Sequence, residues 1–525
     1  MMGTLDSHQE QPLFSYHVNL EHRVRPDHPL RQLKAALDLS FVIPAVRPFY
    51  GRSGHVSLDP RVILKMMLLL FYYDIPSERE LMAQIGERLD FLWFLDFDLE
   101  TSIPDHSVVS KARARWDPGV FEQLFVRTVQ QCVQAGLVDG RLLHVDSTIV
   151  KANASKNSVL ETSPEMVAAL RQAYQVQASK LEVLEPTEAE ATVPTPTPNA
   201  PDQKPGAKKL PVNQTHISRT DPEAHIARCK NGVTDLTYKE HRAVDDAHGV
   251  ITAVQTTVST VADGTQLPAL VEHHQSHTGL SSAGLTLAGD GHYGTADNYL
   301  YCAAQNLRPH LAEASPHLEE RGKLPLSRFT YEAGPDRYRC PQGHYLKLHQ
   351  HKPEALAKVY LMEDPAFCLA CPLRPQCTNA KAGRSLQRHI QAEIIARAQK
   401  EAYSPAGRYS RKRRKHVMEG SFADAANNHG SKRARWRGLA RQQLQGWLIC
   451  ACQNLRLLVK HRRTRPLPVA GAGTVLETIS KLAEKVQRRW KACGPCDRGQ
   501  PSLPKLFDFL VPRHNGSSPN CVHAF

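Results

Sequence analysis

Three acidic residues lie far apart in a basic chain, and they have the clearest capacity for chemistry. They are Asp146 in LLHVDSTIV, Asp290 in LTLAGDGHYGT and Glu419 in RKRRKHVMEGSF. The two aspartates follow apolar runs typical of buried strands, and the glutamate adjoins a cluster of Arg and Lys. A carboxylate at the end of a buried strand is costly unless it is paired or binds a cation. The pattern predicts a divalent-metal site that acts on a polyanion.

Phosphodiester chemistry would explain such a set of carboxylates. Its transition state spreads negative charge over the phosphoryl oxygens, and two Mg²⁺ (or Mn²⁺) ions about 3.5–4 Å apart can activate the attacking oxygen and stabilise the leaving one. Mg²⁺ prefers hard oxygen ligands and needs few of them from the protein. We expect Asp146 to bridge both ions, Asp290 to bind one, and Glu419 to complete the set.

Each carboxylate also has a purely structural interpretation. Asp146 could be a turn or cap residue, and Asp290 lies in a Gly-rich turn, where Asp is common. Glu419 could pair with Lys415 one helical turn earlier, a contact worth only about 0.3–0.5 kcal/mol. The segments around the three residues are what favour a shared site.

Four cysteines between the second and third carboxylates have the spacing of a zinc site. Cys340 lies in RCPQGHY, and CLACPLRPQC contains Cys368, Cys371 and Cys377. A C-x2-C pair with two outlying cysteines suits tetrahedral Zn²⁺, and His344 is an alternative fourth ligand. We expect a structural zinc that stabilises an inserted subdomain. The alternatives are reduced buried cysteines and a site that has lost its metal.

The other cysteine pairs do not indicate redox chemistry. Cys493-Gly-Pro-Cys496 has thioredoxin-like spacing, but no β-strand precedes it and no domain of thioredoxin size surrounds it. Cys450 and Cys452 lie in an apolar helical segment, so we expect them in the core.

Basic residues lie on both sides of the predicted catalytic glutamate. Between residues 402 and 441 the only acids are Glu419 and Asp424, whereas a solvated helix face would mix acids among its bases. We therefore expect phosphate contacts that lay DNA across the metal site. Trp436 could stack on an unpaired base, although a core position is the favoured interpretation. The predicted contacts are Arg411, Arg413, Arg414, Lys415, Lys432, Arg433, Arg435 and Arg437, with Lys151 near the first carboxylate.

The overall composition favours an anionic partner. The 525 residues include 66 Lys and Arg against 52 Asp and Glu, a net charge of +14, and the pI is about 9.2. No run of about 18 apolar residues occurs that could cross a membrane, and no signal peptide is evident. We expect a cytoplasmic protein of two to four domains with reduced cysteines.

The first part of the chain has the apolar periodicity of amphipathic helices. Pro60 lies near the start of LDPRVILKMMLLLFYYDI, and Ser77 is the expected N-cap of the next helix. We expect a helical DNA-binding domain over residues 15–135 with a helix-turn-helix-like element. The alternative is a packing or dimerisation module without DNA contacts. The predicted contacts in this domain are Lys111, Arg113 and Arg115.

A sheet is needed to position the aspartates, and the pattern changes to strands at residue 141. RLLHVDSTIVKA is typical of a buried strand, and LTYKEHRAVDD and GVITAVQTTVST form an antiparallel pair around DDAHG. Helices alternate with the later strands, which predicts an α/β domain with a mixed sheet. The expected divisions are a core over 141–330, interrupted by a helical and Pro-rich disordered insertion at 161–215, a cysteine-rich insertion over 335–380, basic helices that carry Glu419 over 385–463, and a flexible tail over 466–525.

Three segments resemble the catalytic blocks of bacterial insertion-sequence DDE transposases. They are DSTIVKANASKN, GDGHYGTADNYLYCAAQNLRP and EGSFADAANNHGSKRARWRGLARQQLQGWLICACQNLRLL. The helical segment LDPRVILKMMLLLFYYDIPSERELMAQIGERLDFLWFL is similar to that family's N-terminal domain. The resemblance implies a ribonuclease-H-like catalytic core with Asp146, Asp290 and Glu419 as the DDE residues.

One position departs from the family pattern. Many members carry a Lys about two turns after the catalytic Glu, where it contacts a DNA phosphate, and the corresponding residue here is Ala426. His429, Lys432 and Arg433 are the residues that could replace it.

The resemblance implies that the protein is a transposase. It would bind terminal inverted repeats, cleave the 3′ ends of its element and join them to target DNA, acting as a homodimer in the synaptic complex. The residues themselves argue only for metal-dependent phosphoryl transfer on DNA. Two alternatives stay open: a metal-dependent DNA nuclease without strand transfer, and a catalytically inactive DNA-binding relic.

Overall fold

The computed structural model describes residues 19–51, 57–181, 210–229, 232–312 and 324–464. The predicted tail with its Cys-Gly-Pro-Cys segment and most of the predicted Pro-rich insertion lie outside these residues. None of the described helices is both long and apolar enough to cross a membrane.

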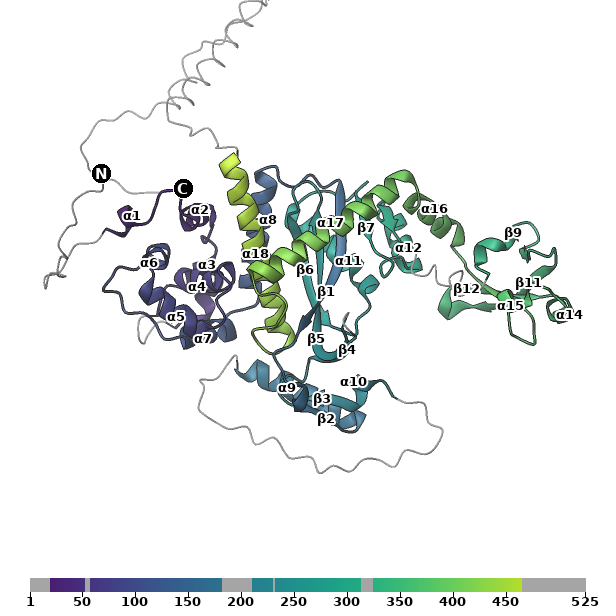
Figure 1. Ribbon diagram of the computed structural model, residues 1–525, viewed down its shortest axis with the longest axis horizontal. Coiled ribbons are helices and arrows are strands. Elements are labelled where there is room, and N and C mark those ends of the chain that lie inside the picture. The colour runs from purple at the N-terminus through teal and green to yellow at the C-terminus, as the bar shows by residue number, and fades with distance from the viewer. Residues whose placement is uncertain (1–18, 52–56, 182–209, 230–231, 313–323, 465–525) are drawn as a thin grey trace, which may run out of the picture. The chain divides into compact units, whose positions relative to one another are not determined.

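Short helices make up the N-terminal part of the chain (Figure 1). Pro60 begins α4, where the Asp59 carboxylate accepts a hydrogen bond from a free backbone N–H. Ser77 caps α5 in the same way, as the sequence predicted. Their apolar faces share one core with α18 (Leu439–Thr464), in which Phe71 and Leu448 are fully buried. The N-terminal helices are α1 (Leu20–Arg23), α2 (Pro29–Ala36), α3 (Val42–Val46), α4 (Pro60–Tyr72), α5 (Glu78–Glu87), α6 (Leu89–Leu95), α7 (Ser107–Arg115) and α8 (Gly119–Gln134).

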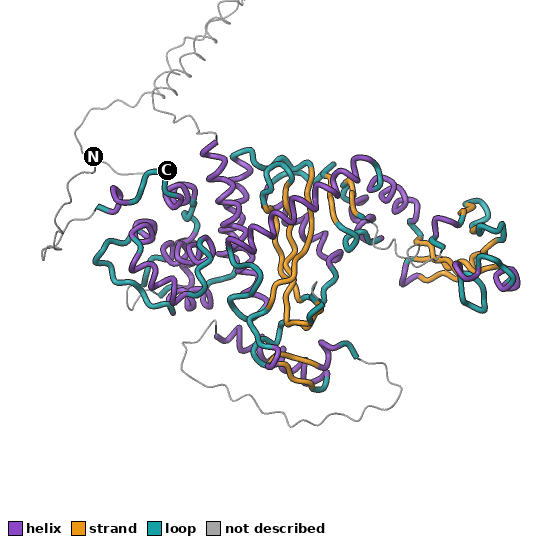
Figure 2. Tube along the Cα trace, viewed as in Figure 1, coloured by secondary structure: helices purple, strands orange, loops and turns teal. Residues whose placement is uncertain are grey.

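A sheet of six strands follows (Figure 2), and it is mixed, as the sequence predicted. Its order is β4-β5-β1-β7-β8, with β6 also paired to β5. β5 is antiparallel to β1, β4 and β6, whereas β1, β7 and β8 are mutually parallel. The strands are β1 (Leu142–Lys151), β4 (His225–Arg228), β5 (Thr234–Asp245), β6 (Ile251–Val258), β7 (Thr286–Gly289) and β8 (Arg308–Leu311).

Helices cover both faces of this sheet. Side chains alternate along β1, so Leu143 and Val145 enter an apolar cluster with α11 (Leu267–Thr278) and α12 (Ala296–Ala304). Asp146 faces the other way and contacts α17 (Pro405–Asn428). α17 lies across β1, β7 and β8 (Figure 1). α16 (Ala392–Ala402) precedes α17 and packs against β8.

The amides of α18 satisfy the outer edge of β6. The Gln443 side chain accepts a hydrogen bond from the Thr256 N–H and donates one to the Val254 carbonyl. Asn454 makes the equivalent pair of bonds with the backbone of Ile251. Unpaired strand edges invite pairing with other chains. These amides therefore protect the edge and fix α18 to the sheet.

A separate antiparallel sheet contains the cysteine-rich segment. Its order is β13-β12-β11-β10-β9, and it runs from Thr330 to His389, which is longer than the insertion expected from the sequence. The elements are β9 (Thr330–Glu332), β10 (Arg337–Arg339), β11 (Tyr345–Lys352), β12 (Ala357–Met362), α14 (Pro365–Leu369), α15 (Arg374–Cys377) and β13 (Ser385–His389). A two-stranded pair, β2 (Val159–Glu161) and β3 (His216–Ser218), flanks α9 (Pro164–Leu181) and α10 (Val212–Thr215) in the sequence.

Candidate functional site: paired carboxylates beneath a basic helix

Asp146 and Asp290 lie on neighbouring parallel strands. β1 and β7 pair with His144 beside Ala288, so two residues further along Asp146 comes beside Asp290. Adjacent strands are about 4.8 Å apart. The negative charge of Asp290 also contributes to raising the pKa of Asp146. The two predicted ligands therefore lie side by side at the end of β7.

Burial and ion pairing oppose each other at Asp146. Its side chain is 22% exposed and forms an ion pair with Arg414 on α17. Its Oδ1 accepts a hydrogen bond from the Ser147 N–H at 2.8 Å. Burial has the largest effect and raises the pKa of Asp146 above its ordinary value, although Arg414 acts to lower it. A half-buried carboxylate gains from a nearby cation, and a guanidinium supplies that charge here.

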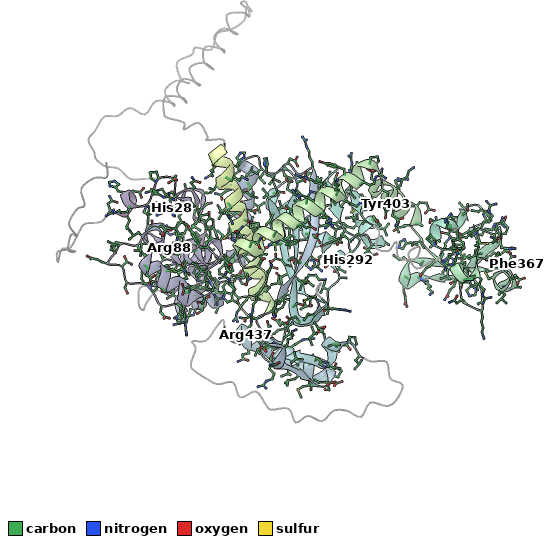
Figure 3. The ribbon with its side chains drawn as sticks, in the orientation of Figure 1. His28, Arg88, His292, Phe367, Tyr403 and Arg437 are labelled. Carbon is green, nitrogen blue, oxygen red and sulfur yellow. The ribbon has the colours of Figure 1, made fainter. Side chains whose placement is uncertain are left out.

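Gly289 and Tyr293 form the packed base of the site. A Cβ on Gly289 would lie 2.8 Å from a Leu311 methyl and 3.0 Å from the Tyr293 Cβ, so the end of β7 accepts only glycine without a shift. Tyr293 is fully buried, and its hydroxyl has no hydrogen-bond partner among the described residues. The Asp290 Oδ1 accepts from the His292 N–H at 2.9 Å and starts the loop that Figure 3 marks at His292.

Glu419 lies on α17 but on a different side of that helix from Arg414. Five residues separate the two positions, which at about 100° per residue rotates Glu419 away from the face that meets Asp146. Its side chain is exposed, whereas the preceding Met418 is buried against the sheet. The structure therefore brings the two aspartates together and leaves the glutamate on a different side of α17 from the one that meets Asp146.

A cavity adjoins the Glu419 side of α17. Phe422 and Ala426 follow Glu419 by three and seven residues, and positions at these spacings share one helix side. Both line a cavity of about 320 Å³ with Thr148 of β1 and with Lys432. Ala426, which stands where many family members carry a Lys, thus borders a cavity that Lys432 also lines.

The donor chemistry of the aspartate pair fits a divalent cation. Mg²⁺ takes one or two carboxylates and completes its octahedron with waters and substrate phosphates. Asp146 and Asp290 supply such a pair of hard oxygen ligands. In the described part of the chain, however, no group of three or more His, Cys, Asp or Glu side chains is already arranged to hold a metal ion.

The predicted DNA contacts divide into exposed and internally paired residues. Arg413 pairs with Asp246 at 2.8 Å, and Lys151 pairs with Asp235 at 2.8 Å while staying half exposed. The Arg411 guanidinium lies over the ring of Tyr403 (also labelled in Figure 3). The exposed residues of the predicted set are Lys111, Arg115, Lys415, Lys432, Arg433 and Arg437.

Two predicted DNA contacts instead join the N-terminal helices to the segment before α18. The Arg113 guanidinium pairs with Glu78 and lies 4.0 Å from the centre of the Trp436 ring, and its side chain is only 9% exposed. Arg435 pairs with Asp74 at 2.7 Å. Trp436 meets Phe71 edge to face at 5.6 Å, which matches the favoured core interpretation.

His429 is not available to replace the family Lys. Its ring is fully buried, and its Nδ1 lies 2.8 Å from the Phe71 carbonyl. Its Nε2 lies 3.2 Å from Arg456. Burial lowers the pKa of this imidazole. Lys432 and Arg433 are both exposed and remain as the possible replacements.

The four predicted zinc ligands line one small cavity of about 20 Å³. Gly343 adopts a positive φ of 86° and closes a tight turn, in which the Cys340 N–H donates to the His344 carbonyl at 2.8 Å. The His344 ring stacks on Phe367 with centroids 4.0 Å apart. Burial raises the pKa of Cys377, and the other three thiols add to that shift. The topology therefore gathers the four cysteines, although among the described residues no group of three or more His, Cys, Asp or Glu side chains is arranged to hold a metal ion.

Buried polar side chains on β5 and β1 were not anticipated from the sequence. Arg242 and Glu240 are both buried and lie on the face that meets α17. His144 is also buried and hydrogen-bonds Asp246 at 2.8 Å. The polar run KEHR inside an otherwise buried strand was the available signal.

Family models match the chain at both ends of this arrangement. Residues 18–115 match the family described as "Transposase domain (DUF772)", and residues 339–459 match the "Transposase DDE domain". No curated protein matches the sequence. A solved piggyBac transposase synaptic complex with hairpin DNA is similar over 89% of this chain and 80% of that chain, at 9% identity and a TM-score of 0.32. That score is too low to bear on the fold or the function.

The two matched segments are of one kind, since both are transposase domains. These two matches support an insertion-sequence DDE transposase.

Proposed function

We propose that the protein binds the terminal inverted repeats of its own insertion sequence, and that Asp146, Asp290 and Glu419 catalyse Mg²⁺-dependent strand cleavage and transfer. The observation that best supports this is the pairing of two aspartates on adjacent parallel strands beneath a helix rich in Arg and Lys. The strand order β6-β5-β1-β7-β8, antiparallel and then parallel, supports a ribonuclease-H-like core.

The chain's own residues would hold the reacting groups in place. Bound divalent cations would supply the Lewis acidity that activates the attacking oxygen and stabilises the leaving one. Asp146 and Asp290 would provide ligand oxygens in their deprotonated form, and Arg414 would share or release Asp146. Glu419 would join them from α17. Lys415 and Lys432 would contact backbone phosphates beside the site.

Partners and location follow from this activity. The substrates would be the terminal repeats and a target duplex, with two copies of the chain holding the two ends in a synaptic complex. An element that moves within a bacterial chromosome places its enzyme in the cytoplasm. Zn²⁺ bound by the cysteines Cys340, Cys368, Cys371 and Cys377 would hold the inserted sheet together.

A joining assay tests the proposal and separates it from its alternatives. The full chain is incubated with Mg²⁺, pre-cut DNA ends that carry the terminal repeat and a free 3′-OH, and a supercoiled target plasmid. Joined products support the proposal. Cleavage of uncut ends without any joining would instead indicate a nuclease. Tight binding without either reaction, in Mg²⁺ or Mn²⁺, would indicate an inactive relic.

A further inference from the structure

Arg242 and Glu240 form an ion pair inside the sheet domain, directly beside the first carboxylate. They lie on β5, where Arg242 is the cross-strand neighbour of Asp146 and Glu240 that of Thr148. Arg242 Nε donates to Glu240 Oε1 at 2.7 Å, and the two side chains are 0% and 1% exposed. The pair therefore occupies the layer between the sheet and α17.

The Arg242 guanidinium reaches two helices at once. Its Nη1 lies 3.0 Å from the Ser421 Oγ and 3.4 Å from the Ser421 carbonyl on α17. The same nitrogen lies 2.9 Å from the Gln453 Oε1 on α18. The guanidinium also lies 5.0 Å from the centre of the Phe422 ring. Ser421 and Phe422 follow Glu419 by two and three residues on α17.

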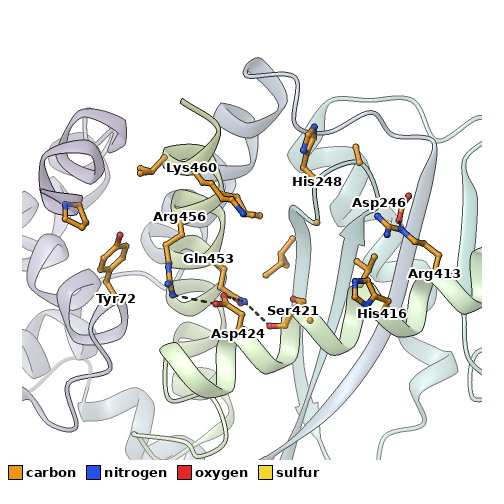
Figure 4. A pocket seen from close by; sticks show the side chains of 18 residues that line it. Tyr72, Asp246, His248, Arg413, His416, Ser421, Asp424, Gln453, Arg456 and Lys460 are labelled. Atoms are coloured by element: carbon orange, nitrogen blue, oxygen red, sulfur yellow. Dashed lines mark hydrogen bonds and ion pairs between the residues drawn. The ribbon is translucent and has the colours of Figure 1, made fainter. Parts of the chain in front are cut away.

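Gln453 extends these contacts to the wall of a large cavity. Its Nε2 donates to the Ser421 carbonyl at 2.9 Å and to the Asp424 Oδ2 at 2.8 Å, and Asp424 pairs with Arg456. Figure 4 shows these side chains around a cavity of about 780 Å³ on the side of α17 where Gly420 lies. Ser421 and Asp424 of α17 line this cavity, and their polar contacts hold the helix at the cavity's border.

The ion pair is a costly way to fill a core. Arg242 Nη2 and Glu240 Oε2 are buried without hydrogen-bond partners in the described chain. Buried pairs are often replaced by apolar residues without loss of stability, because desolvation offsets their attraction. What an apolar replacement could not reproduce is a directional contact to a defined point on α17.

We propose that Arg242 is a positioning residue, which fixes the height and rotation of α17 over β1 and so sets Glu419 relative to Asp146 and Asp290. This inference rests on the proposed function. Arg242 is the cross-strand neighbour of Asp146, and its guanidinium binds Ser421 of α17. It therefore connects the strand that carries Asp146 to the helix that carries Glu419. Misplacing one ligand of a metal site by about 1 Å is enough to lower the rate strongly.

The test uses the full chain with the double substitution Glu240→Gln and Arg242→Met, which removes both charges together so that neither is left unpaired. Arg242→Lys is the conservative variant, and Glu332→Gln with Arg337→Met removes a pair in the inserted sheet as a control. Three quantities are measured: the melting temperature, amide hydrogen exchange of α17, and the Mn²⁺ concentration that half-saturates the protein, read by electron paramagnetic resonance.

We expect the double variant to melt near the wild-type temperature and to bind Mn²⁺ about tenfold more weakly, with faster exchange around Ser421. Arg242→Lys should give a Mn²⁺ affinity and an exchange rate between those of the wild type and the double variant. The control variant should match the wild type. If exchange or Mn²⁺ affinity stays at the wild-type level in a folded double variant, the positioning role is wrong. Mn²⁺ binding is measured without strand cleavage. A wild-type protein that cleaves no DNA would overturn the proposed function, whereas the Mn²⁺ and exchange measurements would still decide the positioning role of Arg242.

Discussion

Asp146 combines a raised pKa with an ion pair, and this combination shapes how the proposed metal would bind. Burial favours the protonated acid, and Asp290 adds to that effect, while Arg414 favours the carboxylate. A cation can bind only the deprotonated form, so protons and metal compete for the same oxygens. Without metal, the raised pKa also makes the folded state less stable as pH rises from the ordinary Asp value of 3.8 through the raised one, because folding favours the proton.

Metal affinity should therefore fall as the pH is lowered, beginning above the pH at which an ordinary aspartate protonates. The measurement is Mn²⁺ binding between about pH 4 and pH 7. Glu419→Gln should bind more weakly with the same pH dependence, since it keeps Asp146, and Asp146→Asn should lose binding. An affinity that stays constant down to about pH 4 would contradict this account.

Neighbouring basic residues on α7 should behave differently when they are replaced. Lys111 is exposed, so Lys111→Ala should weaken DNA binding and reduce the salt slope of log K by about one, without a change in melting temperature. Arg113 pairs with Glu78, which is 14% exposed. Arg113→Ala should destabilise the fold by about 3–5 kcal/mol because it leaves a buried carboxylate unpaired. The two variants are compared by DNA titration at several salt concentrations and by thermal unfolding. A lower salt slope in a stable Arg113→Ala protein would reverse the assignment.

At the scale of elements, the inserted sheet offers a direct test of the zinc proposal. Cys371→Ser should abolish bound zinc, measured by elemental analysis at about one ion per chain in the wild type, and should lower the melting temperature. Cys229→Ser lies outside the cluster and should retain zinc. A zinc-free wild-type protein, purified without chelator and still folded, would refute the proposal.

Local signals in the sequence predicted much of this fold. The Pro60 and Ser77 helix starts, the β5–β6 turn and the strand at β1 all depend on residues close together in the chain, and the structure has each of them. The extension of the inserted sheet to β13 was missed, because pairing between distant strands leaves no local periodicity. The capping of the β6 edge by Gln443 and Asn454 was missed for the same reason.

The candidate site was predictable in its residue types but not in its geometry. Asp146 and Asp290 follow apolar runs, and the register of β1 and β7 brings them together. The exposed position of Glu419 depends on the rotation of α17, which distant residues such as Arg242 determine. The internal use of Arg113 likewise depends on a partner helix that its own segment does not reveal.

At the scale of the whole molecule, the N-terminal helices and the helix after the site share one core. Phe71 and Leu448 are buried in the same cluster, and Arg435 and His429 bind the end of α4. The net charge of +14 favours association with a polyanion before any specific contact forms. DNA binding at the N-terminal helices would therefore act, through these contacts, on the segment between α17 and α18.

The central claim is that three carboxylates from β1, the end of β7 and α17 form one metal-dependent catalytic site. The most direct measurement is single-turnover cleavage of a terminal-repeat substrate by the wild type and by Asp146→Asn, Asp290→Asn and Glu419→Gln. We predict that each substitution lowers the rate by at least about a thousandfold, with DNA affinity and melting temperature nearly unchanged. Cleavage at the wild-type rate by any one of the three folded variants would contradict the claim.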